Sequence, residues 1–470
     1  MGDLSMIASR SSVQDFYKDS VVLITGGSGF IGKVLIEKLL RCFEVKKIYL
    51  LLREKKNVKS KDRLKEIVQE PIFHVLKNNN STAASFFSKV TAIDTNFQQA
   101  EIISEQDRAV LHAEVTVVFN VMASVKFDER IETALDTNVN CSRKLFDLVA
   151  KMSQLRSIVH VSTFYSNCDR GHIEERIFDN VPFGGQDNIL QIFSHLTEHE
   201  KDQLTPFILG GMPNSYTFSK KCAEVMIRER YSHLPIAIFR PPVVISAYQE
   251  PIPGWVDNFN GVVGCCIPMT QGKIYCARGE PNFPSHSVPV DYCVAAMLAV
   301  GAEPRNHRPV EQIRTPVVYN YATDGNNVRW GDYGWRAATG CATPLGRFFG
   351  RFALGVSTSR IRRQLFIWWF VFQAVVADLL LTITGKQQKN FRLVKRVLAL
   401  EKAACFFALH RWTVQNDNMH RVQRELTEED RKLLEFDIDK LDWKDYFKHF
   451  VPGIKAALAR CAQRRRIECG

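Results

Sequence analysis

The sequence has no cysteine pattern of the kind that supports a disulfide framework or a metal site. Its 12 cysteines include no C-x-x-C pair and no regular spacing, and Cys265 and Cys266 are adjacent within an apolar run. Disulfide scaffolds and structural zinc sites both depend on such spacings. We therefore expect reduced thiols in a protein that faces the cytosol, and we expect no bound metal.

Two other absences narrow the class of protein. Residues 1–12 (MGDLSMIASRSS) lack the apolar core of a secretory signal. The formal charge of +12 is accompanied by no zinc-finger spacing and no basic recognition helix, so we do not expect nucleic acid as a partner. An anionic membrane surface and a phosphorylated substrate are the two remaining explanations for the charge.

The length of 470 residues exceeds that of one ordinary domain, and the composition is that of a globular protein. From Val21 onward, short runs rich in β-branched residues alternate with helical patterns. This alternation is typical of a parallel sheet covered by helices on both faces, so we predict an α/β fold with a Rossmann-type doubly wound sheet. The predicted strands are residues 21–25, 47–52, 89–93, 115–120, 157–162 and 236–239.

The pattern changes in two later parts of the chain. Residues 171–213 lack clear periodicity, so we interpret them as an insertion near the active site. After about Thr323 arginines accumulate, and no acidic residue occurs between Tyr333 and Ala377. The expected organisation is an N-terminal extension (1–18), a nucleotide-binding domain with an interleaved substrate lobe (19–322) and a mainly α-helical C-terminal region (323–470).

A glycine-rich turn follows the first predicted strand. It reads TGGSGFIG from residue 25, so that Gly27, Gly29 and Gly32 satisfy G-x-G-x-x-G, and Gly26 gives the looser G-x-x-G-x-x-G spacing with the last two. Such glycines allow a tight turn and let backbone N–H groups approach a pyrophosphate at the start of a helix. Because the turn lies between a strand and an amphipathic helix, the sequence predicts a dinucleotide-binding site.

The end of the second predicted strand indicates which dinucleotide is bound. Sites for NAD place an acidic residue there, which holds the ribose 2′-hydroxyl. This sequence has Arg53, Lys55 and Lys56 instead. A cation at the strand end would pair with the 2′-phosphate of NADPH, so we predict NADPH with Arg53 as its phosphate contact. Lys55 and Lys56 fit equally well as solvated surface charges.

A candidate catalytic set consists of a Tyr-x-x-x-Lys pair and two hydroxyls at a strand end. The segment NSYTFSK (214–220) places Tyr216 and Lys220 four residues apart, on one face of a helix. A neighbouring ammonium favours the phenolate and brings the pKa of a tyrosine nearer to the working range. Ser162 and Thr163 stand at the end of the fifth predicted strand, where a hydroxyl would hold a substrate carbonyl.

These residues are those of the extended short-chain dehydrogenase/reductase superfamily, and further segments narrow the resemblance. The chain resembles the insect-like fatty acyl-CoA reductases from about Val21 to its C-terminus, and PGWVDNFNG is the most specific segment. The resemblance is carried by VKFDE (125–129), VSTFYSNCD (161–169), PNSYTFSK (213–220), PGWVDNFNG (253–261) and VPVDY (288–292).

The resemblance implies a role for each candidate residue. Tyr216 would donate a proton, Lys220 would tune the tyrosine and bind the nicotinamide ribose, and Thr163, in preference to Ser162, would hold the substrate oxygen. The implied cofactor site comprises Gly26, Gly27, Ser28, Gly29, Phe30, Ile31, Gly32, Arg53, Asp94, Asn96, Asn138, Lys220 and Pro241.

The sequence departs from the family pattern at a few positions. AIDTN replaces the usual Gly-Asp pair after the third strand, so Asp94 or Asn96 would have to reach the adenine. Cys141 replaces a glycine three residues after Asn138, and Pro242 replaces a serine after the sixth strand. None of these changes removes the Tyr216–Lys220 pair.

The resemblance implies reduction of a long-chain fatty acyl-CoA to a primary alcohol, through a bound aldehyde and with two NADPH. Two alternatives stay open at this point. One is another extended short-chain oxidoreductase, such as a hydroxysteroid dehydrogenase, which would favour an acidic residue at position 53. The other is a catalytically silent lipid-binding protein on the same fold. The sequence does not indicate the oligomeric state.

A run of 20 apolar residues (365–384), interrupted by Gln373 and Asp378, has about the length needed to span a bilayer. Basic residues flank it on both sides, so charge gives no orientation. A spanning helix, an interfacial hairpin and a buried core helix all fit this pattern. We expect attachment to an intracellular membrane on its cytosolic face, such as the endoplasmic reticulum, the peroxisome or a lipid droplet.

Overall fold

The computed structural model describes residues 12–55, 57–78, 87–270, 276–303, 315–339, 355–385 and 390–469. Within them a central seven-stranded parallel sheet has the order β11–β7–β5–β4–β1–β2–β3. The order reverses between β1 and β4, as in a doubly wound sheet, and the predicted α/β class is confirmed. The strands are β1 (Val21–Thr25), β2 (Lys47–Leu52), β3 (Val90–Asp94), β4 (Val117–Asn120), β5 (Ser157–Val161), β7 (Ile236–Arg240) and β11 (Val317–Asn320).

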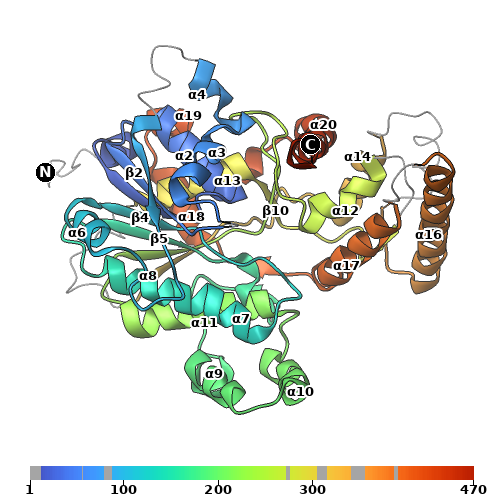
Figure 1. Ribbon diagram of the computed structural model, residues 1–470, viewed down its shortest axis with the longest axis horizontal. Coiled ribbons are helices and arrows are strands. Elements are labelled where there is room, and N and C mark those ends of the chain that lie inside the picture. The colour runs from blue at the N-terminus through green and yellow to red at the C-terminus, as the bar shows by residue number, and fades with distance from the viewer. Residues whose placement is uncertain are drawn as a thin grey trace, which may run out of the picture.

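Helices cover both faces of this sheet, and its strands are buried almost along their whole length, as apolar parallel strands require. Figure 1 shows α2 (Phe30–Cys42), α3 (Ser60–Val68) and α13 (Val290–Gly301) on one face. The other face carries α6 (Glu105–Glu114), α8 (Cys141–Val149) and α11 (Ser215–Tyr231). The carboxyl ends of the strands therefore meet at one edge, where ligands bind in sheets of this type.

The predicted strand boundaries agree with the structure to within two residues, and those of β1 and β2 agree fully. The sequence analysis missed β11, which lies at the edge of the sheet beside β7. Its four residues, VVYN, are too few to show a period.

The interpretation of residues 171–213 needs correction. They include a two-residue strand, β6 (His172–Ile173), and two helices, α9 (Gln186–Ser194) and α10 (Glu198–Leu209). The two helices project from the body below α7 (Ile131–Leu135) and α11 in Figure 1, and no residue of 171–213 is among those that line the candidate active site. A capping box of Thr197 and Glu200 begins α10 and was the readable signal for it.

One helix that precedes β11 and several that follow it pack together outside the central sheet. α12 (Gly261–Thr270) packs against both α14 (Trp330–Thr339) and α17 (Asn390–Leu409), and α20 (Trp443–Cys469) contacts α12 and α14. Two short strands, β9 (Cys276–Arg278) and β12 (Gly355–Ser357), pair in parallel next to them. Further along, α18 (Asp417–Glu425) packs against β11, and α19 (Glu428–Leu433) follows it.

The first described helix, α1 (Val13–Tyr17), is part of the folded body. The Tyr17 side chain is fully buried and its hydroxyl donates to the Leu298 carbonyl oxygen at 2.9 Å. The Val13 amide donates to a carboxylate oxygen of Asp430 at 3.0 Å, across 417 residues of sequence. A direct hydrogen bond thus joins α1 to α19.

One helix among the described residues, α16 (Arg360–Ile383), is long and apolar enough to cross a membrane by its length and composition. Only 17% of its most apolar window is buried, so the alternative of a buried core helix does not hold. Figure 1 shows it at the margin of the molecule, beside α17. Asp378, which interrupts the apolar run, is itself 7% exposed because it faces α17.

Candidate active site

A cavity of 470 Å³ lies at the carboxyl ends of β1, β4, β5 and β7. Its walls come from the glycine turn after β1, the segment after β4, the end of β5, the first turns of α11 and the segment after β7. Residues of α12, α14 and α17 close the remaining side. The cavity therefore occupies the crevice where the strand order reverses, which is where doubly wound sheets bind nucleotides.

The glycine turn can form only because two of its residues lack a side chain. Gly26 has a φ of +70°, and a Cβ atom there would lie 2.9 Å from the Met122 backbone nitrogen. A Cβ atom at Gly32 would lie 2.3 Å from the Gly26 carbonyl oxygen. Gly29 is the N-cap of α2 and provides no side-chain cap, so the first-turn N–H groups of the helix can bind an anion.

Most of the turn predicted to bind the cofactor lines the cavity. Gly27 does not, because it packs against the sheet, where a Cβ atom would lie 3.1 Å from the Leu50 side chain. The residues of the turn that line the cavity are Gly26, Ser28, Gly29, Phe30, Ile31 and Gly32. Pro241 and Lys220, which were also predicted to contact the cofactor, line the same cavity.

Two arginines converge beside this turn. Arg53, at the end of β2, is exposed. Arg63, on α3, donates through Nη1 to the Arg53 carbonyl oxygen at 2.5 Å and through Nη2 to the Ser28 hydroxyl at 3.2 Å. Burial, together with the charge of Arg53, lowers the pKa of Arg63. Sequence reasoning missed Arg63, because only the packing of α3 brings it next to the glycine turn.

The residues predicted to reach the adenine lie outside the cavity lining. Asp94 ends β3, and its carboxylate accepts from the Ser60 amide at 3.2 Å, at the start of α3. The Asn96 side chain accepts from the Gln98 amide at 3.0 Å, within its own turn. Both residues are exposed at the edge of the sheet beside β2.

Asn138 is buried and connects two walls of the site. Its side-chain oxygen accepts from the Ser124 amide at 2.8 Å, and its Nδ2 donates to the Ser219 hydroxyl at 2.9 Å. It lies in a single π-helical turn, Asp136–Asn140, and such turns are frequent at functional sites. Asn138 therefore fixes the segment after β4 against α11.

α11 presents Tyr216, Lys220 and Glu224 at successive four-residue steps, so they share one face. Lys220 is buried and its Nζ donates to the Val161 carbonyl oxygen at 2.6 Å. Burial lowers its pKa to about 8, although the carboxylate of Glu224 opposes this shift. Burial also raises the pKa of Tyr216 to about 12, and a hydrogen bond with Thr163 opposes that change.

The two hydroxyls at the end of β5 have different surroundings. The Ser162 hydroxyl donates to the buried Glu224 carboxylate and is therefore part of the hydrogen-bond network in the protein interior. The Thr163 hydroxyl lies next to Tyr216 and 3.5 Å from the Pro241 carbonyl oxygen, and it accepts from the Tyr165 amide at 3.3 Å. Of the two, Thr163 is the one placed beside the tyrosine.

Glu224 is the centre of a buried polar network behind these residues. Both its oxygens accept from Arg240, at 2.9 Å and 2.6 Å, and the two side chains are 2% and 0% exposed. The Ser166 hydroxyl also donates to it, at 2.9 Å. Arg240 in turn donates to the carbonyl oxygens of Glu174 and Arg176 at 3.0 Å and 2.8 Å.

The PGWVDNFNG segment closes the cavity over the glycine turn. The Trp255 ring stacks on Phe30, with 5.4 Å between ring centroids. Asp257 forms an ion pair with Lys33 of α2 at 2.5 Å. Asn258 lines the cavity next to them. The segment is therefore a loop of the substrate lobe that also forms one wall of the site.

Solved structures with this fold include reductase domains of peptide-synthesising enzymes. The terminal R domain from the myxalamid PKS-NRPS pathway has a TM-score of 0.57 at 17% identity, with 94% of this chain and 91% of that one covered. A reductase domain from Mycobacterium tuberculosis has a TM-score of 0.58 at 14% identity, with 94% and 92% covered. The chain therefore has the fold of the extended reductases.

Comparison of sequences places it within one family. Residues 24–297 and 369–461 match two family models, NAD-binding and Sterile, that are both described as male sterility protein. Fatty acyl-CoA reductase wat of Drosophila melanogaster is 32% identical, over 96% of this chain and 86% of that protein. Fatty acyl-CoA reductase 1 of Homo sapiens is 30% identical, over 94% and 85%. The chain belongs to the fatty acyl-CoA reductase family, which confirms the resemblance inferred from its motifs. Its cofactor is a nicotinamide dinucleotide.

The buried network predicts a large loss of stability when one partner is removed. Arg240→Met would leave the Glu224 carboxylate buried without its cation, which costs about 3–5 kcal/mol. The measurement is the free energy of unfolding in urea. Arg228→Met is the matched control, because Arg228 pairs with an exposed Asp179 and its loss should cost less than about 1 kcal/mol. Equal losses in the two variants would contradict the assignment.

Proposed function

We propose that this chain reduces long-chain fatty acyl-CoA to the primary alcohol, with release of CoA and consumption of two NADPH. The observation that carries the proposal is the placement of Thr163, Tyr216 and Lys220 across a cavity from a glycine turn suited to a pyrophosphate. Relatives that cover most of the chain are named fatty acyl-CoA reductases, which supports the substrate class.

The proposed chemistry assigns one task to each side chain. The bound coenzyme supplies hydride to the thioester carbonyl carbon. The Tyr216 hydroxyl donates the proton that the carbonyl oxygen takes up, and the Thr163 hydroxyl holds that oxygen. The resulting hemithioacetal breaks its C–S bond, releasing CoA as the thiol and leaving the aldehyde. Tyr216 would then regain a proton from solvent and a second NADPH would replace the spent coenzyme, so that a second hydride and a second proton from Tyr216 could convert the aldehyde to the alcohol.

Lys220 is proposed to act on Tyr216 and on the cofactor ribose. With a pKa of about 8 it carries a positive charge at neutral pH, although it is buried. Burial raises the pKa of Tyr216 and the hydrogen bond with Thr163 opposes that rise. We expect a cation one helical turn from the tyrosine to favour the phenolate in the same direction. The hydrogen bond to the Val161 carbonyl oxygen holds its ammonium at the cavity wall.

The two alternatives fit less well. A hydroxysteroid dehydrogenase-like enzyme would favour an acidic residue at position 53, where this chain has Arg53. A catalytically silent lipid-binding protein would not need Thr163, Tyr216 and Lys220 together in one cavity. The family relatives favour neither of them.

The reaction is tested with purified protein, NADPH and palmitoyl-CoA, with hexadecanol as the measured product. Tyr216→Phe keeps the ring but removes the proton donor, so NADPH should still bind while turnover falls by about a hundred- to ten-thousandfold. Tyr231→Phe on the same helix is the control, because that hydroxyl bonds Asp147 away from the cavity. Near-normal alcohol formation by Tyr216→Phe would show that the proton comes from another group.

The choice of NADPH over NADH is proposed from two guanidinium groups. Arg53 and Arg63 lie close enough for the charge of one to lower the pKa of the other, and Arg63 also bonds Ser28 of the glycine turn. Two cations held together beside the dinucleotide turn repel each other, and a bound phosphate dianion would relieve that repulsion. This arrangement is suited to the 2′-phosphate of NADPH.

Arg53→Glu and Arg63→Glu should each weaken NADPH binding by about ten- to a hundredfold, the usual contribution of a hydrogen bond to a charged group. Binding of NADH should change little, so the measurement is the ratio of the two dissociation constants. Lys55→Glu is the control, since we interpret Lys55 as a solvated surface charge. An unchanged ratio in both arginine variants would overturn the phosphate assignment.

Attachment to a cytosol-facing intracellular membrane is proposed to occur through α16. Large apolar side chains on its outer face are exposed, with Trp368 at 69% and Leu379 at 60%. Exposed apolar surface of this extent on one helix marks a contact with membrane or protein. The formal net charge of +12 favours an anionic membrane surface as the partner.

An interfacial hairpin of α16 and α17 is the favoured form of this attachment. The Asp378 carboxylate accepts from the Asn390 and Phe391 amides, at 2.9 Å each, and so caps α17. Exposed cations follow along the same helix, at Arg392 and Lys395. A full span of α16 would draw these charges toward the hydrocarbon, whereas a helix lying at the interface leaves them among the lipid headgroups.

Membrane attachment is tested by flotation with vesicles of phosphatidylcholine and phosphatidylserine. The wild-type protein should float, and Trp368→Ser with Leu379→Ser should release most of it without loss of folding, because both side chains are exposed. Phe207→Ser, an exposed aromatic on α10, is the control and should still float. Wild-type protein that stays monodisperse without detergent and does not float would exclude attachment.

The division of the chain is also part of the proposal. We assign 19–322 to the nucleotide-binding domain with its substrate lobe, and 323–470 to the C-terminal region. Separate family models match residues 24–297 and 369–461, which supports a boundary between them.

A further inference from the structure

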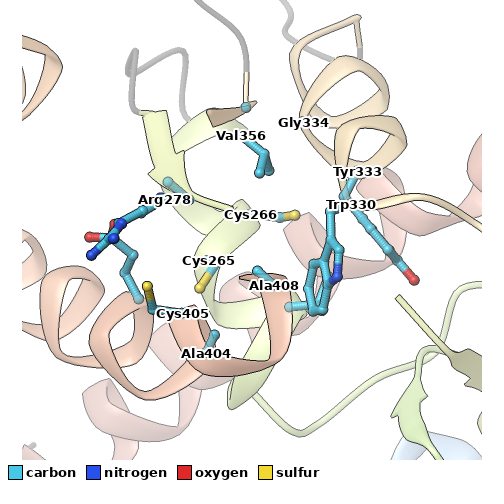
Figure 2. Close-up of a pocket in the computed structure, with 14 residues that line it drawn as sticks. Cys265, Cys266, Arg278, Trp330, Tyr333, Gly334, Val356, Ala404, Cys405 and Ala408 are labelled. Atoms are coloured by element: carbon cyan, nitrogen blue, oxygen red, sulfur yellow. The ribbon is translucent and has the colours of Figure 1, made fainter. Parts of the chain in front are cut away.

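A second, smaller cavity of about 50 Å³ lies beside the candidate active site, between α12 and α17. Figure 2 shows Cys265 and Cys266 of α12, Ala404 and Cys405 of α17, and Trp330 of α14 around it. Further residues of these helices and residues of β9 and β12 complete its lining. None of these side chains has a part in the proposed chemistry.

The small cavity is continuous in its lining with the active site. Val262, Trp330 and Ala404 line both cavities, so no more than one layer of side chains lies between them. The Phe407 ring lines the active site on the same side, and its neighbour Ala408 lines the small cavity. A flexible ligand held at Tyr216 therefore needs only to pass Trp330 to enter it.

The surface of the small cavity is suited to an apolar ligand. Cysteine, alanine, valine and glycine residues form most of it. Burial raises the pKa of Cys265 to about 12, so its thiol is uncharged. The Glu401 carboxylate at its margin is already paired with Arg363 of α16, at 2.5 Å, and accepts from the Arg278 amide at 2.9 Å. The charged groups therefore lie at one margin of the cavity, where the buried Nε of Arg278 has no hydrogen-bond partner among the described residues.

We propose that the acyl chain of the substrate occupies this cavity, which makes the residues between α12 and α17 the determinants of chain length. The inference rests on the proposed function, since it requires a thioester carbonyl at Tyr216. The chain would run from the carbonyl past Trp330, between Cys265 and Cys405, toward Arg278. In Figure 2 the Arg278 guanidinium lies on the opposite side of the cavity from Trp330, so the margin with the charged groups is the far end.

The consequence is a chain-length dependence that side chains of the small cavity control. Each buried methylene group contributes about a fourfold change in affinity. A ligand too short to pass Trp330 gains nothing from the cavity, whereas a long chain gains for every methylene placed in it. Cys265→Phe or Val356→Phe would fill the space from opposite walls, α12 and β12.

The experiment measures kcat/KM for palmitoyl-CoA and octanoyl-CoA in the full-length protein. Cys265→Phe and Val356→Phe should each lower kcat/KM for palmitoyl-CoA by about fiftyfold or more and leave that for octanoyl-CoA within about threefold. Cys461→Phe adds the same ring to α20, outside both cavities, and should change neither value. An equal loss for both substrates in the two filling variants, with unchanged NADPH binding, would overturn the proposal.

A second measurement separates this inference from the proposed reaction. Palmitoyl-CoA with a diazirine near the end of its chain should label residues 261–268 or 401–408 on irradiation, whether or not it is reduced. Labelling confined to the exposed face of α16 would overturn the cavity assignment. Labelling in the cavity by a wild-type protein that forms no alcohol would retain the acyl site and overturn the proposed reaction.

Discussion

The buried ion pair of Glu224 and Arg240 is the interaction on which the candidate site depends. Two charges without solvent are tolerated only when each is nearly saturated with partners, and here the carboxylate also takes the hydroxyls of Ser162 and Ser166. The pair joins α11, which carries Tyr216, to the ends of β5 and β7. The ion pair therefore fixes the distance between Tyr216 and the strand ends from the buried side of α11. The active-site cavity, on the other side of these residues, contains few charges of its own.

Much of the fold could be predicted because it depends on local patterns. Parallel strands buried on both faces are continuous apolar runs, and the glycines at 26 and 32 are required by backbone contacts that no other residue permits. The spacing of Tyr216 and Lys220 predicts a shared helix face, and the structure has that geometry. Six strands, the class of fold and the residues of the turn were thus readable from the sequence, together with the family.

The rest depends on contacts between distant segments, which the sequence does not encode locally. Arg63 reaches Ser28 only through the packing of α3, and Glu224 is recognisable as a partner of Ser162 only once β5 and α11 are side by side. Asp378 interrupts an apolar run, and only the structure shows that it caps a second helix. Asp94 and Asn96 stand where family analogy puts an adenine contact, and their side chains accept from the backbone amides of Ser60 and Gln98.

The hydrogen bond between Val13 and Asp430 has a consequence for the order of events during synthesis. The ribosome makes the chain from its N-terminus, so α1 is synthesised more than four hundred residues before Asp430, its hydrogen-bond partner. Contacts of such separation form late in folding, since the closure of a long loop must precede them. By then α16 has left the ribosome with its apolar face uncovered. The contact that ties α1 to α19 can therefore form only after α16, with its exposed apolar side chains, has been synthesised.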